Sequence, residues 1–409
     1  MNTTIPELVR QIHDSPVRIV LAISGGGTRA ISAIAEVAGA SRTLLEAVVP
    51  YSSAAMAQWL GGRPDQFCAP STTRRMAMAA MFRANELADS DAATSRAGVA
   101  CTAGLLSDRP KMGPHRAHVS IQTIDLTLSQ SLRLEKGLRD REQEETLVAR
   151  LVLNAVAEAC GVHDRLDLKL SENERVESSR TDAPRLWQDL LRGKLDAICH
   201  SATAQTTLDQ ADEQQPTSNL TPSMTPPSLG RERPTPRAVF PGAFNPVHVG
   251  HLKMVEMAQK LLDCPVEMEI SVQNPDKPPL DYETIRRRVE QFTARATVWL
   301  TRAATFEEKS KLFPGAVFIV GADTIRRIAE PRYYGSRAGC QAALEGIASR
   351  GCRFLVFGRD SGTGFANLSH FDLPLVLRSI CQEVPAATFR QDVSSTAIRR
   401  ARDWKELAS

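Results

Sequence analysis

The segment from Ala238 to His251 most constrains the fold of this chain, because it predicts a buried strand that runs directly into a helix. The apolar residues 238–240 predict the strand, and a turn containing Gly242 follows. His248 and His251 stand where we expect the helix to begin, and its body runs over residues 250–262. Three positions apart, the two histidines share one helical face. Free N–H groups and the helix dipole at such a terminus favour an anion.

Gly242 and the histidine pair therefore predict a binding site. A residue without Cβ lets the backbone approach a bound group closely. The alternatives are a solvated histidine pair and a zinc site. Both are disfavoured, since no cysteine or acidic residue stands nearby at the spacing of metal ligands. We predict an anion site without a protein-bound metal.

The rest of the C-terminal part alternates predicted strands and helices. The expected strands are residues 266–272, 298–300, 316–320 and 353–357; the expected helices are 282–296, 306–312, 323–328 and 394–404. This order is typical of an α/β fold with a parallel sheet, helices on both faces, and ligands at the carboxyl ends of the strands.

The chain is expected to contain two domains and a linker. Residues 202–236 are rich in Pro, Thr, Ser and Gln and hold almost no large apolar residues, so we predict a flexible linker. It separates an α/β domain, residues 1–165, from the domain at 237–409. Residues 166–201 are predicted to be a helical extension without chemistry, because the apolar residues of 184–199 have helical spacing.

The composition is that of an ordinary globular protein, with 42% hydrophobic and 24% charged residues. A net charge of +3 gives no reason to expect nucleic-acid or membrane binding. No apolar run approaches the length of a membrane span, and residues 1–14 lack the core of a signal peptide. Eight cysteines without a CxxC pair suit reduced thiols, which predicts a cytoplasmic protein.

The turn and histidine pair carry a family resemblance. The run Phe244-Asn245-Pro246-Val247-His248-Val249-Gly250-His251 resembles the first motif of the nucleotidylyltransferase superfamily. The Asn-Pro form resembles nicotinamide and nicotinate mononucleotide adenylyltransferases, because cytidylyltransferases more often carry Asp at the position of Asn245. The resemblance implies a Rossmann-like domain in which Gly242, Phe244 and Asn245 contact the nucleotide.

Three further segments match this resemblance. Gly321 and Asp323 resemble the family's Gly-x-Asp step beside the nucleotide, although Asp323 could instead only cap the next helix. Residues 393–400 resemble Ile-Ser-Ser-Thr-x-x-Arg, which implies a phosphate cradle of Ser394, Ser395, Thr396 and Arg399. Arg359 is similar to a phosphate-facing arginine, and Lys277 to a substrate-loop lysine. A stacking aromatic is not evident, and Tyr333 and Tyr334 are the candidates.

The mechanism that the resemblance implies is nucleotidyl transfer. An acceptor phosphate attacks the α-phosphorus of ATP or CTP and pyrophosphate leaves. His248 and His251 are the expected catalytic residues, which hold the triphosphate and stabilise the charge that develops. Mg²⁺ is the expected cofactor, held largely by phosphate oxygens and water.

The N-terminal domain contains a second glycine turn. An apolar strand over residues 17–23 is followed by Ser24-Gly25-Gly26-Gly27 and a helix over 29–38, which is a weak anion-cradle pattern. A patatin-like lipase is one interpretation, but residues 39–43 lack the closing glycine of a nucleophile elbow. Residues 15–160 instead resemble the C-terminal domain of CinA, the nicotinamide-nucleotide deamidase family.

In that family the serine matching Ser24 and a lysine belong to the amidase site, but here Met56 occupies the lysine position. A serine nucleophile needs a base, for which His115 and His118 are alternatives. We therefore expect this domain to bind a nucleotide-like ligand, regulate, or self-associate without deamidation.

The sequence favours adenylyl transfer from ATP to nicotinate or nicotinamide mononucleotide, because the CinA-like family handles the same nucleotide. Two alternatives stay open: cytidylyl or adenylyl transfer to another phosphorylated acceptor, and a non-catalytic nucleotide-binding regulator. The acceptor pocket is expected around residues 274–290 and 330–340.

Overall fold

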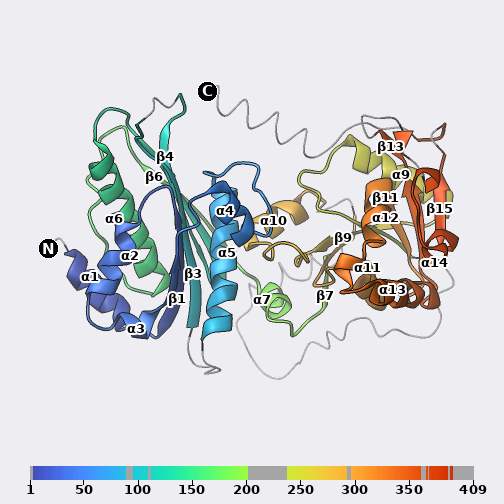
Figure 1. Ribbon diagram of the computed structural model, residues 1–409, viewed down its shortest axis with the longest axis horizontal. Helices are drawn as coiled ribbons and strands as arrows, with labels where there is room; N and C mark the ends of the chain where they lie inside the picture. Colours follow the sequence, from blue (N-terminus) through green and yellow to red (C-terminus); the bar gives the residue numbers. More distant parts are fainter. Residues whose placement is uncertain are drawn as a thin grey trace, which may run out of the picture. The chain divides into compact units, whose positions relative to one another are not determined.

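The computed structural model of this protein describes residues 3–88, 95–108, 112–200, 237–292, 296–360, 365–366, 368–385 and 387–389 (Figure 1). The chain forms two compact units, each built around its own sheet. The first unit comprises Met1–Arg192 and Asp276–Arg286, and the second comprises Gly193–Pro275 and Arg287–Ser409. The expected α/β fold with two domains is confirmed. A short segment from the C-terminal half, residues 276–286, belongs to the first unit.

The first unit has a mixed six-stranded sheet of order β2-β1-β3-β4-β5-β6. β1 is parallel to both β2 and β3, whereas each neighbouring pair from β3 to β6 is antiparallel. The strands are β1 Val17–Ser24, β2 Leu44–Val48, β3 Ser95–Gly104, β4 His115–Gln122, β5 Leu126–Leu134 and β6 Val176–Asp182.

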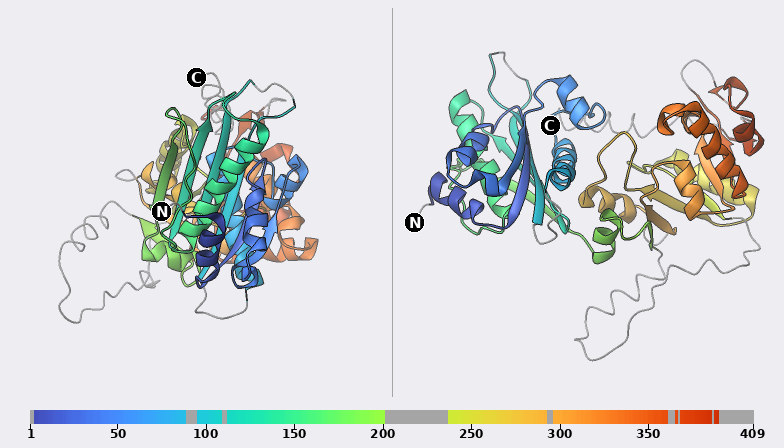
Figure 2. Two further views of the ribbon diagram at one scale, coloured as in Figure 1. Left: turned by 90° about the vertical axis from the view of Figure 1, so that its left-hand side faces the viewer. Right: turned by 60° about the horizontal axis from the view of Figure 1, so that its bottom comes forward.

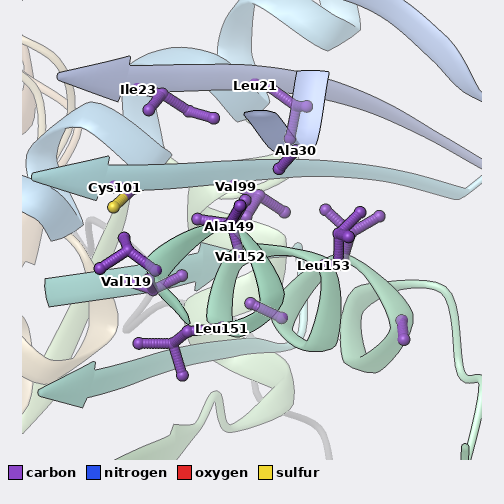
Figure 3. Packing of buried hydrophobic residues seen from close by; sticks show 14 of the residues in the cluster. Leu21, Ile23, Ala30, Val99, Cys101, Val119, Ala149, Leu151, Val152 and Leu153 are labelled. Atoms are coloured by element: carbon purple, nitrogen blue, oxygen red, sulfur yellow. The ribbon is translucent and has the colours of Figure 1, made fainter. Parts of the chain in front are cut away.

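Helices cover both faces of this sheet (Figures 1 and 2). They are α1 Ile5–His13, α2 Arg29–Glu36, α3 Ala40–Thr43, α4 Ser53–Trp59, α5 Pro70–Leu87, α6 Arg141–Ala159 and α7 Arg185–Leu191. Alternate residues of β1 face opposite ways. Leu21 and Ile23 pack in the cluster that contains α1, α2 and α6, part of which Figure 3 shows, and Ala22 packs in the cluster formed by α4 and α5.

Helix α5 lies directly against β3. A Cβ added at Gly98 would lie 2.0 Å from the carbonyl oxygen of Ala77 and 2.3 Å from the amide nitrogen of Met81. The glycine in the strand and the small residues Ala77, Ala80 and Ala84 on the helix therefore permit this close approach.

The second unit has a seven-stranded sheet of order β15-β12-β11-β8-β9-β10-β7. Every neighbouring pair is parallel except β10 and β7 at one edge. The strands are β7 Ala197–His200, β8 Ala238–Pro241, β9 Val266–Ser271, β10 Val298–Thr301, β11 Val317–Gly321, β12 Arg353–Phe357 and β15 Cys381–Val384, with a hairpin of β13 Arg359–Asp360 and β14 Phe365–Ala366.

This strand order places a topological switch point beside β8. The chain builds the sheet outward from β8 through β9 to β10, then returns to the other side of β8 at β11 and continues to β12 and β15. Doubly wound sheets bind ligands at the carboxyl ends of the strands where the order reverses. The predicted Rossmann-like parallel sheet is confirmed, and the turn after β8 lies at its switch point.

The helices of the second unit are α9 Val249–Leu262, α11 Phe306–Leu312, α12 Ala322–Ile328, α13 Arg337–Ser349 and α14 Leu375–Ser379, with 3₁₀ turns at Pro331–Tyr333 and Leu368–His370; α10, Tyr282–Glu290, crosses the boundary between the units. Val239 and Phe318 pack with α12 and α13 on one face of the sheet. Phe240, the next residue of β8, contacts His251 of α9 instead.

The predicted helical extension over residues 166–201 is wrong. Only α7 is helical there, β6 precedes it, and β7 pairs with β10. The helix ends before Gly193, which has φ +78°, and a Cβ at that position would lie 2.4 Å from Nη1 of Arg302. Leu195 and Ile198 thus fall beyond the helix, in the approach to a strand whose pairing the apolar spacing did not reveal. The helix predicted over 282–296 ends at Glu290. The predicted linker, residues 202–236, and the predicted helix over 394–404 lie outside the described residues.

A buried ion pair ties α11 to β9 in the second unit. Nζ of Lys309 lies 2.7 and 2.8 Å from the two carboxylate oxygens of Glu269 and 2.9 Å from the carbonyl oxygen of Ala303. Both side chains are at most 5% exposed. The hydroxyl of Thr301 donates to the same carboxylate at 2.5 Å. All three protons of the ammonium group therefore have acceptors, which buried charges require.

We expect Lys309→Met to destabilise the second unit by about 3–5 kcal/mol, because the variant leaves the Glu269 carboxylate buried without its counter-charge. Hydrogen exchange of the β9 and β10 amides measures this local stability. The matched control is Lys311→Met on the same helix, whose side chain is 56% exposed and pairs with Glu307; it should change stability by less than about 0.5 kcal/mol. Equal effects of the two variants would contradict this assignment.

Candidate functional site

The turn between β8 and α9 is organised around Phe244. This residue has φ +43° and is only 1% exposed. Its ring meets the rings of Phe240, His251 and Phe292 edge to face, with centroid distances of 5.4, 5.2 and 5.1 Å. A Cβ at Gly242 would lie 2.5 Å from Cζ of Phe244. The structure thus gives Gly242 a packing role, to admit the Phe244 ring, in addition to the ligand role predicted for it.

Gln291 fastens this turn at two points. Its amide nitrogen donates to the carbonyl oxygen of Phe244 at 3.0 Å, and its amide oxygen accepts from the backbone N–H of Val247 at 2.8 Å. Gln291 and Phe292 were not predicted to be site residues. A glutamine and a phenylalanine near a helix end carry no motif, so only their contacts identify them.

His248 and His251 stack at the start of α9, as their spacing predicts. The ring centroids are 3.7 Å apart and the planes differ by 19°. The backbone N–H of His248 donates to Nδ1 of His251 at 3.3 Å. Since Nδ1 accepts this bond, the proton of the neutral imidazole resides on Nε2, where it is a donor for another group. Gly250 between them is buried.

The pKa of His251 is lowered to about 4, first by burial of the ring and then by the neighbouring His248. The imidazole is therefore neutral at pH 7 in the free protein. A polyanion bound here would favour the protonated form, because an opposite charge within a few ångströms raises the pKa of a histidine.

Gly321 and Asp323 lie at the same edge of the sheet as this turn. β11 is the parallel neighbour of β8, with Val317 opposite Ala238, so both strands end at the carboxyl edge. Gly321 caps the N-terminus of α12, and a Cβ added to it would meet no atom within 4 Å. Asp323 is exposed in the first turn of that helix. The structure therefore brings the Gly-x-Asp step and the histidine turn to neighbouring strand ends.

The other predicted site residues stand as follows. Asn245 is exposed in the turn. Arg359 begins β13, directly after β12, and its side chain is not among those described. Ser394, Ser395, Thr396 and Arg399 lie outside the described residues. Lys277 belongs to the first unit, whereas the histidines belong to the second.

The two tyrosines considered as stacking residues differ in their surroundings. Arg332 and Arg327 place their guanidinium carbons 4.6 and 5.8 Å from the centroid of the Tyr333 ring. Tyr334 is half-buried against the core of the second unit, and burial raises its pKa to about 12. Tyr333 is thus flanked by cations, and Tyr334 serves packing.

In the first unit, the hydroxyl of Ser24 donates to the carbonyl oxygen of Pro50 at 3.1 Å. The strand register runs from Ser24 to Thr102 and on to His118, so these residues share one face of the sheet. His118 bonds to Ser131 at 2.8 Å, and burial followed by the charge of Arg116 lowers its pKa to about 4. The serine proton is directed to a carbonyl group, which cannot act as a general base.

Met56 and His115 do not supply that base either. Met56 is 1% exposed within the apolar cluster of α4 and α5. His115 is an odd number of residues from His118 on β4 and so faces the opposite side of the sheet. Its Nδ1 donates to the buried carboxylate of Glu144 at 2.6 Å.

The glycine turn of the first unit already binds a carboxylate. The oxygens of Glu145 accept from the N–H of Gly27 at 2.9 Å, the hydroxyl of Thr28 at 2.9 Å and the N–H of Arg29 at 3.2 Å. Arg141 adds a fourth donor at 3.2 Å. Burial raises the pKa of Glu145, but these hydrogen bonds outweigh it and the pKa is lowered overall. The anion that the turn was predicted to attract is therefore the protein's own side chain.

Residues 239–401 match the cytidylyltransferase-like family. The matched range contains the turn, the histidine pair and the Gly-x-Asp step, and it supports a nucleotidyltransferase-type function in general. A comparison with curated proteins finds no match.

The chain is also similar to solved structures of competence/damage-inducible proteins, the family named from residues 15–160. The CihA protein of Agrobacterium tumefaciens is 20% identical to this chain, with a TM-score of 0.30. The matched region covers 39% of this chain and 98% of that protein. The Enterobacter asburiae protein is 18% identical, with a TM-score of 0.31, at 39% and 98% coverage. A CinA superfamily protein of Escherichia coli is 19% identical, with a TM-score of 0.29, at 38% and 90% coverage. Similarity at this level carries no argument about what the first unit binds.

Among the described residues, no group of three or more His, Cys, Asp or Glu side chains could hold a metal ion. No helix in the described ranges is long and apolar enough to cross a bilayer.

We expect His251 to remain neutral down to about pH 4 in the free protein. Because the unfolded chain binds this proton near pH 6.5, the unfolded state holds more protons between about pH 6.5 and 4, and stability falls as the pH drops through that window. NMR titration of the imidazole signals, with the His251 signal assigned by its loss in His251→Gln, measures the pKa. A value near 6.5 would contradict the burial and stacking described.

Proposed function

We propose that this protein transfers the AMP group of ATP to the phosphate of nicotinate or nicotinamide mononucleotide and releases pyrophosphate. The observation that carries the proposal is the stacked histidine pair at the start of α9, beside the switch point of a doubly wound sheet. The nucleotidyltransferase-type domain supports the reaction class. Asn245-Pro246 supports a pyridine mononucleotide as acceptor, by the resemblance stated above.

The chemistry requires little covalent participation from the protein. An oxygen of the acceptor phosphate attacks the α-phosphorus of ATP, the bond from that phosphorus to the bridging oxygen breaks, and pyrophosphate leaves with the bonding electrons. Charge on the phosphoryl oxygens changes during this step. His251 carries its proton on Nε2, because Nδ1 accepts from the backbone N–H of His248, and this Nε2–H is suited to donate to such an oxygen.

The two helix termini at the carboxyl edge, those of α9 and α12, add N–H donors and positive dipole ends for phosphate groups. The open space around Gly321 is compatible with a ligand there. We assign Arg359, Ser394, Ser395, Thr396 and Arg399 to the β- and γ-phosphates on sequence grounds.

Mg²⁺ is proposed as the cofactor, and it supplies charge neutralisation to the triphosphate. Asp323 has an exposed carboxylate at this edge of the sheet, and the described residues contain no cluster of acidic ligands. This arrangement fits an ion that is held mainly by phosphate oxygens and water.

The test incubates the protein with Mg²⁺, either ATP or CTP, and a panel of phosphorylated acceptors, and measures pyrophosphate. Release is expected with ATP and a pyridine mononucleotide. His251→Ala should lower kcat/KM by about 10²–10³-fold, the effect of removing one donor to a developing charge.

The matched control is Lys260→Ala, at the far end of the same helix, where the side chain is exposed and paired with Glu256; it should retain activity. Release with CTP, or with another acceptor alone, would change the substrate assignment. No release with any acceptor, together with unchanged ATP binding in His251→Ala, would exclude the transferase.

We further propose that the first unit has no amidase activity. Ser24 has a carbonyl partner, Met56 replaces the expected lysine, and the glycine turn is occupied by Glu145. The protein should release no ammonia from nicotinamide mononucleotide above the level of a Ser24→Ala variant, in a coupled ammonia assay. Release that depends on Ser24 would show that the unit is a working amidase.

A further inference from the structure

The turn that leads into the histidine pair is braced by two residues that lie much later in the chain. Residues 245–246 form the tip of this turn, between Phe244 and Val247. Gln291 and Phe292, which follow α10, contact the chain on its two sides. The turn and these two residues all belong to the second unit, so the contacts are internal to one compact unit.

The carboxamide of Gln291 bonds to the backbone on both sides of the tip. Its nitrogen donates to the carbonyl oxygen of Phe244 at 3.0 Å, and its oxygen accepts from the N–H of Val247 at 2.8 Å. The nitrogen also donates to the carbonyl oxygen of Arg288 at 3.4 Å. A planar carboxamide whose donor and acceptor are both in use has little freedom to rotate. One side chain therefore fixes the separation of the two ends of the turn.

Phe244 requires such a brace, because its backbone is in an unfavourable conformation. Its φ of +43° lies in the left-handed region, which a bulky residue rarely adopts. Such a conformation persists only where surrounding contacts hold it, and it occurs most often at functional sites. The Phe244 ring packs against that of Phe292, with centroids 5.1 Å apart, while Gln291 holds the carbonyl group. Two adjacent residues after α10 thus maintain the conformation of Phe244.

The position of Val247 determines where α9 begins. His248 follows it directly and is the N-cap of the helix. The N–H of His248 donates to Nδ1 of His251 at 3.3 Å, and the two imidazole rings stack with centroids 3.7 Å apart. His251 also contacts the ring of Phe244, at a centroid distance of 5.2 Å. Both residues that Gln291 holds therefore adjoin the histidine pair, one through the chain and the other through its ring.

We propose that Gln291 is a positioning residue for nucleotidyl transfer. Its carboxamide holds the two sides of the turn so that His248 and His251 keep the stacked arrangement in which they meet a triphosphate. Gln291 acts through the turn, and the histidines are the groups that contact the substrate. This inference rests on the proposed function for its kinetic measurement alone. Its structural measurement, the titration of His251, is independent of catalysis.

The test uses two variants whose side chains are close to glutamine in length. Gln291→Met removes both bonds to the turn. Gln291→Glu keeps the acceptor for Val247, but its ionised carboxylate has no N–H to donate and repels the carbonyl oxygen of Phe244; it replaces Gln291→Met if that variant does not fold. The matched control is Thr305→Ala, which removes the hydroxyl that caps α11 in the same unit. The control also loses a side-chain bond to the backbone but should leave the turn unchanged.

At pH 7 both Gln291 variants should lower kcat with ATP and mononucleotide by about 10–100-fold, because a small misplacement of catalytic groups has an effect of this size. The KM for ATP should stay within about threefold of the wild-type value, since the loss falls on the transition state. In Gln291→Met the pKa of His251, measured by NMR, should rise from about 4 toward 6.5 as the packing of Phe244 loosens.

Three results would overturn the inference. The first is a raised KM with unchanged kcat, which would assign Gln291 to ground-state binding. The second is an unchanged His251 titration in Gln291→Met, and the third is the same change of titration in Thr305→Ala. If the wild-type protein transfers nothing to any acceptor, the proposed function fails, and the His251 titration alone decides this inference.

Discussion

The packing of Phe244 is the constraint on which the candidate site depends. Its ring occupies the space that Gly242 leaves open and contacts Phe240 of β8, His251 of α9 and Phe292 after α10. One aromatic side chain therefore joins a strand, a helix and a second helix end at the switch point of the sheet. The burial that it provides also keeps His251 neutral, with Nδ1 accepting from the backbone and the ring proton on Nε2. The packing of Phe244 therefore determines both the shape of the turn and the protonation state of His251.

The first unit illustrates how a binding pattern can be retained while its ligand is replaced. The glycine turn after β1 directs two N–H groups and the Thr28 hydroxyl to one point, but the carboxylate of Glu145 accepts from all three, with Arg141 as a fourth donor. A buried anion with four partners is stable and leaves few donors for another ligand.

Local patterns predicted much of the fold and less of the site. The α11 and β12 ranges, 306–312 and 353–357, and the parallel sheet follow from apolar spacing and alternation, which are properties of short segments. The helical extension failed because β7 forms only by pairing with β10, a contact between residues some hundred positions apart. Gln291 escaped prediction for the same reason. Its role depends on the carbonyl oxygen of Phe244, which no sequence neighbour indicates.

The sequence by itself determined the two α/β units, the strand–turn–helix with its histidine pair, and the class of chemistry that the pair supports, because these depend on residue type and short spacing. Tertiary structure alone decided three other properties: that Gly242 accommodates Phe244, that Glu145 fills the glycine turn, and that residues 276–286 belong to the first unit. The second and third of these properties join residues distant in the chain, and the first depends on the positive φ of Phe244 and on the rings that pack around it. Such contacts are selected by the packing and charge balance of the whole fold, which local spacing does not encode.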